Sequence, residues 1–124
     1  MFTQWYETDP DCCQYIRRDG SKYEMIQCVW LDTTEEDKKK GVHEYCITRI
    51  GIDLDDYSDE EKEIHLSSYG YTLQSVSEEY GHDVDSIIAE CIMEEECLRD
   101  AYVIDDADSF EEAKEKIKKI IKEV

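Results

Sequence analysis

The chain has 124 residues, of which 40% are hydrophobic and 10% aromatic, enough apolar material for one domain with one core. Its formal net charge of -19 argues against direct binding to nucleic acid or to anionic membranes, since both require Lys and Arg. No apolar run approaches the ~20 residues that span a bilayer, and the first residues lack the features of a secretory signal. We therefore expect a single domain, residues 1–124, in a reducing cytosol, with its six cysteines as thiols.

The first half of the chain predicts antiparallel strands. Residues 12–31 read as a β-hairpin, because two runs rich in Tyr, Ile, Val and Trp flank the turn dipeptide Asp19-Gly20. Both faces of the second run are apolar, which predicts a strand that is covered on both sides. Residues 32–41 are a polar connection with room for one helical turn. Residues 42–54 alternate as a third strand, in which Gly51 is a candidate bulge.

Two short helices are predicted after the third strand. Ser58, with Glu61 three residues later, forms a capping box, in which each residue bonds the backbone N–H of the other. It opens a helix over residues 58–66. Thr72 has a hydroxyl suited to cap a second helix over residues 73–80.

The last third of the chain predicts two longer helices. Apolar residues recur at helical spacing over residues 83–98, and Asp83 is placed to cap them. A second capping box, Ser109 with Glu112, opens a final helix that continues to the end of the sequence. Between these helices, residues 101–105 are a candidate fourth strand.

These elements together predict an α+β fold. The expected sheet is antiparallel, with three strands mostly within residues 12–54, or four if residues 101–105 join it. The helices, mostly within residues 58–124, are expected to pack against it.

The negative charge is concentrated in the middle of the sequence. Residues 41–113 contain 22 Asp and Glu against three Lys and Arg, a net charge of -19, whereas the rest of the chain holds 11 of each sign. Solubility of a small domain needs a net charge of only ~2–8. The central block therefore indicates a surface that meets a basic protein surface, although a merely solvated face is the alternative.

The sequence predicts neither a metal site nor a cofactor. A calcium-binding loop that starts at Asp53 has suitable residues at positions 1 and 3 but fails at positions 5, 6 and 12. The cysteines include no C-x-x-C pair, and Cys12 and Cys13 are adjacent. This pattern indicates buried thiols rather than zinc ligands.

Catalytic motifs are not found either. His43, His65 and His82 belong to no nucleophile elbow and no cysteine-protease signature. The five glycines form no phosphate-binding loop. Paired carboxylates are uninformative in so acidic a chain. We therefore expect a protein that is not an enzyme and has no catalytic residues.

The acidic surface remains as the functional candidate. Residues 52–64 read IDLDDYSDEEKEI, in which seven of thirteen positions are acidic, and we interpret them as a strand end that leads into a capped helix. Closely spaced carboxylates can approximate the charge of duplex DNA, about one per 1.7 Å of axis, and tyrosine is enriched in interface hot spots. The candidate partner-binding residues are Asp53, Asp55, Asp56, Tyr57, Glu60, Glu61, Glu90, Glu94, Glu95 and Glu96.

The charged segments IDLDDYSDEEKEI and ECIMEEECLRD, on a small chain without catalytic motifs, resemble the small acidic inhibitors of phages and mobile elements. These include anti-CRISPR proteins and DNA-mimic anti-restriction proteins. The resemblance lies in size, charge and tyrosine content and carries no residue roles. It implies a stoichiometric inhibitor that occludes the nucleic-acid cleft of a nuclease such as a CRISPR effector. The alternative is a cytosolic interaction, regulatory or immunity protein without nucleic-acid mimicry.

Overall fold

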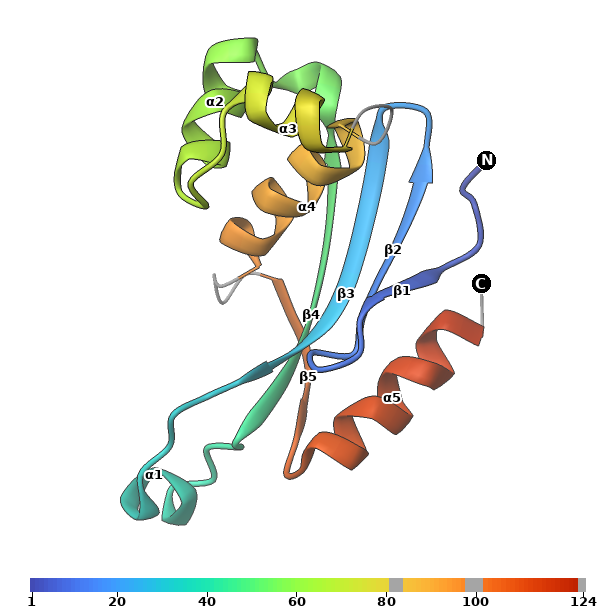
Figure 1. Cartoon of the computed structure of the whole chain (residues 1–124). Helices are drawn as coiled ribbons and strands as arrows, with labels where there is room; N and C mark the ends of the chain where they lie inside the picture. Colours follow the sequence, from blue (N-terminus) through green and yellow to red (C-terminus); the bar gives the residue numbers. More distant parts are fainter. Residues whose placement is uncertain (81–83, 98–101, 123–124) are drawn as a thin grey trace.

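The computed structural model describes residues 1–80, 84–97 and 102–122 (Figure 1). These residues form an α+β fold, as predicted, in which one antiparallel sheet has the strand order β1-β2-β3-β4-β5. The strands are β1 (Tyr6–Asp9), β2 (Gln14–Asp19), β3 (Lys22–Trp30), β4 (Tyr45–Asp53) and β5 (Val103–Ala107). The helices are α1 (Glu35–Lys39), the short 3-10 helix η1 (Leu54–Asp56), α2 (Asp59–Ser67), α3 (Leu73–Tyr80), α4 (Val84–Glu96) and α5 (Phe110–Lys122).

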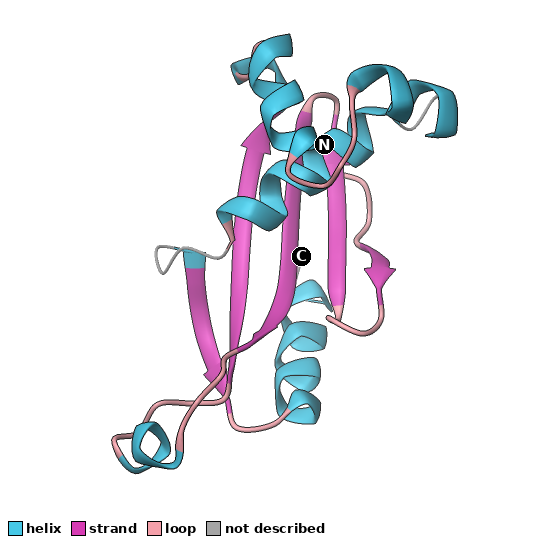
Figure 2. Cartoon of the chain, turned by 60° about the vertical axis from the view of Figure 1, so that its left-hand side comes forward, coloured by secondary structure: helices cyan, strands magenta, loops and turns pink. Residues whose placement is uncertain are grey.

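Helices cover both faces of the sheet (Figures 1 and 2). The alternation of side chains along β3 explains this arrangement. Tyr23 and Met25 point to one face and pack in the core beneath α2, α3 and α4. Ile26 and Cys28 point to the other face and pack in a second core against α5. The prediction that this strand is covered on both sides is confirmed.

The predicted hairpin is present, with its turn one residue later than expected. Asp19 pairs with Lys22, so the two turn residues are Gly20 and Ser21. Gly20 has a positive φ of 60°, which glycine adopts without a steric penalty. The expected bulge at Gly51 is wrong, because the pairing of β3 with β4 continues through this residue without a shift in register.

The sheet has five strands, whereas the sequence predicted three, or four if residues 101–105 join it. The candidate fourth strand is present as β5, displaced slightly along the chain to Val103–Ala107. The additional strand, β1, was not predicted. Three of its four residues are exposed, so it lacks the alternation of buried and exposed positions that identifies a half-buried strand.

The polar caps begin the helices where the sequence predicted. At α2, Ser58 Oγ accepts the backbone N–H of Glu61, and the Glu61 carboxylate accepts the backbone N–H of Ser58, which confirms the capping box. At α3, Thr72 Oγ1 accepts the N–H of Ser75 at 3.0 Å. The polar connection before β4 contains the single helical turn of α1, capped by Thr34.

The cap of α5 differs from the prediction in one bond. Ser109 Oγ accepts the N–H of Glu112 at 3.1 Å, as expected. The Glu112 carboxylate, however, accepts the N–H of Asp108 rather than that of Ser109. The predicted cap of α4 at Asp83 lies outside the described residues.

The described helices include none that combines the length and the apolar character needed to cross a bilayer. Five of the six cysteines are buried, and Cys12 is half-buried. This burial confirms the interpretation of most cysteines as small core residues.

Candidate functional site

Most of the excess negative charge lies on one side of the sheet. Residues 53–80 and 84–96, which run from the end of β4 through α4, contain 14 Asp and Glu and one Lys, a net charge of -13. We call these residues, which include α2, α3 and α4, the acidic layer. The α5 helix, on the opposite face, contains three Glu and five Lys, a net charge of +2. The sheet therefore separates most of the lysines of α5 from the acidic layer.

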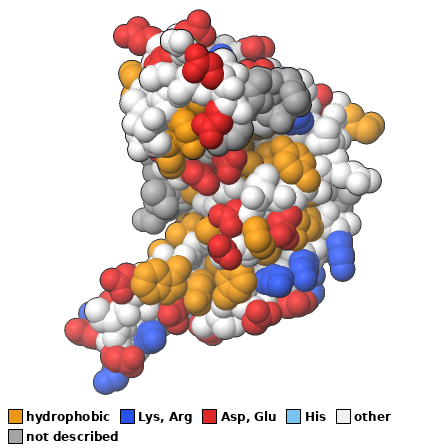
Figure 3. All heavy atoms as spheres, in the orientation of Figure 1, with side chains coloured by type: hydrophobic (Ala, Val, Ile, Leu, Met, Phe, Trp, Pro, Cys, Tyr) orange, Lys and Arg blue, Asp and Glu red, His pale blue; other side chains and the backbone are white. Residues whose placement is uncertain are grey.

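Figure 3 shows one face of the molecule, on which lysines gather along α5, while acidic side chains lie over the α2–α4 end and also lower on this face. Lys116 of α5 does meet acids, but they lie outside the acidic layer. Its Nζ is 3.4 Å from Asp105 of β5 and 3.3 Å from Glu112 of α5 itself.

The ten candidate residues fall into three groups, of which the first surrounds the start of α2. Asp55, Glu60 and Glu61 are exposed there. The Glu61 carboxylate also completes the capping box, so part of its role is structural. Acids in a first helical turn are stabilised by the helix dipole. This first turn therefore holds exposed charge without destabilising the helix locally.

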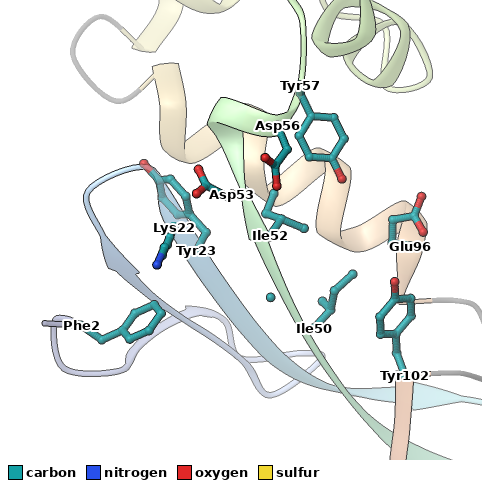
Figure 4. Close-up of a pocket in the computed structure, with 11 residues that line it drawn as sticks. Phe2, Lys22, Tyr23, Ile50, Ile52, Asp53, Asp56, Tyr57, Glu96 and Tyr102 are labelled. Atoms are coloured by element: carbon teal, nitrogen blue, oxygen red, sulfur yellow. The ribbon is translucent and has the colours of Figure 1, made fainter.

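The second group lines a cavity of about 560 Å³ at the junction of β4, η1 and the end of α4 (Figure 4). It unites Asp53, Asp56 and Tyr57 with Glu96, which is some forty positions away in the sequence. The other lining residues are Phe2, Lys22, Tyr23, Ile50, Gly51, Ile52 and Tyr102.

Asp53 is held in place and kept ionised at the wall of this cavity. Its Oδ1 accepts a hydrogen bond from Ser21 Oγ at 2.6 Å and another from the backbone N–H of Asp55 at 3.0 Å. The bond from Ser21 is the main cause that lowers the pKa of Asp53, followed by the bond from Asp55. Both bonds favour the carboxylate form.

Tyr57 and Tyr102 stand on either side of Glu96 in Figure 4. Burial raises the pKa of Tyr57, and the nearby carboxylate of Glu96 raises it further, so its hydroxyl stays protonated at neutral pH. The Tyr57 ring also contacts His65 edge-on, with the ring centroids 5.9 Å apart. Through this contact, the wall of the cavity packs against α2.

The third group, on α4, is half-buried and largely bonded within the protein. Glu94 Oε1 accepts a hydrogen bond from Gln14 Nε2 of β2 at 3.1 Å. Glu95 pairs with His65, and its pKa is lowered first by a hydrogen bond from Ser68 and then by His65. Burial, followed by the charges of neighbouring carboxylates, raises the pKa of Glu90 to about 7.

The structure thus brings together only part of the predicted surface. Sequence reasoning placed Glu90 and Glu94 one helical turn apart, but nothing in the spacing shows that α4 turns them toward the first strands. It also missed Phe2, Lys22 and Tyr102 as cavity residues. Phe2 has no apolar or polar pattern around it in the sequence. The side chain of Tyr102 packs against the core, so no sequence signal marks its second role.

The described ranges contain no group of three or more His, Cys, Asp or Glu residues arranged to hold a metal ion. No protein-family model, curated protein or solved structure matches this chain.

Proposed function

We propose that this protein is a non-enzymatic inhibitor that acts in the host-cell cytosol and occupies the basic nucleic-acid cleft of a nuclease. One observation carries this proposal: the acidic layer has a net charge of -13 and lies on the opposite side of the sheet from the lysines of α5. A surface of this kind attracts a basic cleft and repels nucleic acid.

The physical consequence is an association that is fast and sensitive to salt. Complementary fields steer diffusing partners together and mainly increase the association rate. At physiological ionic strength the Debye length is about 8 Å, so exposed carboxylates act mainly on nearby cations. The cleft would therefore have to enclose the acidic layer closely.

The direct test is inhibition of nucleases. We would titrate the protein into cleavage assays with an RNA-guided nuclease and with several restriction nucleases. The expected result is inhibition of at least one enzyme near equimolar ratio, relieved by excess duplex and by added salt. If binding survives both excess duplex and high salt, the protein binds its partner without mimicry, as the regulatory or immunity alternative requires. If it inhibits no nuclease, the proposal fails.

A matched pair of variants shows whether the acidic layer is responsible. The first replaces Asp55, Asp59 and Glu60 with the corresponding amides, which removes three exposed charges from the start of α2. We expect it to weaken inhibition by roughly tenfold. The control removes three exposed charges near α1, with the substitutions Asp32→Asn, Glu35→Gln and Glu36→Gln. Equal weakening by both variants would mean that net charge alone matters.

A further inference from the structure

We propose that the cavity between β4, η1 and α4 binds an arginine side chain of the partner protein. This inference rests on the proposed function for the nature of the partner. The recognition chemistry is argued from the cavity itself and can be tested without any nuclease.

The cavity has room for a long side chain and an apolar wall along which that side chain can lie. Its volume of about 560 Å³ lies within the range of small-molecule sites, about 300–1,000 Å³. The inner wall is apolar and comes from β4, where Ile50 and Ile52 lie. An arginine stem has three methylene groups that can lie along such a wall while its charged end meets polar groups.

The negative charge of the cavity favours the binding of a cation. Among the described lining residues, three carboxylates, from Asp53, Asp56 and Glu96, outnumber the one ammonium group, from Lys22. This excess of negative charge disfavours anions. The hydrogen bonds to Asp53 keep its carboxylate ionised, so this charge persists at neutral pH.

The aromatic rings favour a guanidinium over an ammonium. Tyr57 and Tyr102 enter the cavity from different elements, with Glu96 between them (Figure 4). A planar guanidinium stacks on aromatic rings and presents five N–H donors to carboxylates, whereas the lysine ammonium is a compact and strongly hydrated charge. The protein makes this contact elsewhere: the Arg17 guanidinium lies over the Trp5 ring at 4.4 Å.

The test uses three short peptides that differ only at a central residue: arginine, lysine or citrulline, which has the shape of arginine without its charge. Binding to the full chain would be followed by amide chemical shifts in two-dimensional NMR spectra. We expect the arginine peptide to shift the amides of Gly51, Asp56 and Tyr57. The lysine and citrulline peptides should bind roughly tenfold more weakly.

Two double variants with the same change in charge locate the binding site. Asp56→Asn with Glu96→Gln should weaken arginine binding roughly tenfold. Asp32→Asn with Glu35→Gln, exposed near α1 and outside the cavity, should change it less than about twofold. Equal weakening by both variants, or equal binding of the citrulline peptide, would overturn the cavity as an arginine site.

These outcomes are separable from the proposed function. If the arginine peptide binds the cavity and no nuclease is inhibited, the inference about the cavity holds and the nuclease proposal fails. If a nuclease is inhibited equally by the natural protein and by the Asp56→Asn/Glu96→Gln variant, the acidic layer acts without this anchor and the inference is wrong.

Discussion

Glu90 lies where α4 meets the first strands, in a cluster of negative charge. Burial raises its pKa to about 7, and the carboxylates of Glu94 and Asp9 contribute to the shift. The folded protein therefore holds this proton at pH values where the unfolded chain has lost it. Stability falls as pH rises through this interval, from near the ordinary carboxyl pKa to about 7, because ionisation then costs more in the folded state.

We expect Glu90→Gln to stabilise the protein at about pH 8 and to have little effect at about pH 5. After allowance for solvent screening of a carboxyl that is only partly buried, the gain should be about 1–2 kcal/mol in the free energy of unfolding. Urea denaturation at both pH values measures it, and Glu79→Gln, exposed on α3, is the control. A gain that does not depend on pH would contradict this assignment.

The spacing of residues predicted which acids are neighbours, but not what surrounds them. An α-helix places residues four apart on one face, so the proximity of Glu90 to Glu94 follows from the sequence. The hydrogen bond that Glu94 accepts from Gln14, eighty positions away, depends on how α4 crosses the sheet. No local pattern encodes that crossing, so the half-burial of these carboxylates could not be predicted.

At the scale of elements, α5 is the single helix packed on its face of the sheet among the described residues (Figure 2). Ile117 is fully buried there, with 0% of its surface exposed. We expect Ile117→Ala to cost about 2–5 kcal/mol in the free energy of unfolding, because it removes buried atoms and leaves a cavity. Urea denaturation measures this cost. Lys119→Ala, on the exposed side of the same helix, should change stability by no more than about 0.5 kcal/mol.

The elements were largely predictable where polar caps and periodic apolar residues coincide. Ser58, Thr72 and Ser109 each begin a helix as predicted, because their hydroxyls accept backbone N–H groups that the helix leaves unpaired. β1 could not be predicted in this way. It is a short edge strand whose exposed side chains leave no pattern, and it forms through backbone pairing with β2.

At the scale of the whole molecule, the sequence predicted that charge is concentrated but not how the fold distributes it. The acids of residues 53–61 are close together in any fold, because they are close in the chain. Tyr57 lies near Glu96 and Tyr102 only because α4 and β5 fold back against β4. Such long-range contacts depend on the packing of all the elements at once.

The acidic layer also opposes folding, since its like charges repel one another more strongly in the compact state than in the unfolded chain. Added salt should relieve this repulsion. Raising NaCl from about 0.01 M to about 0.15 M shortens the Debye length from about 30 Å to about 8 Å. We expect the free energy of unfolding, measured by urea denaturation, to rise by roughly 1 kcal/mol over this interval.

The two sets of amide variants show where the repulsion arises. Replacing Asp55, Asp59 and Glu60 with the corresponding amides removes charge from the acidic layer. This variant should therefore show a smaller rise in the free energy of unfolding when salt is added. Replacing Asp32, Glu35 and Glu36 with amides should reduce this salt-dependent rise less, because Lys38 and Lys40 already pair with the glutamates of α1. Equal reductions, or stability that falls with salt, would contradict this account. If the prediction holds, the carboxylates that attract a partner also lower the stability of the folded protein.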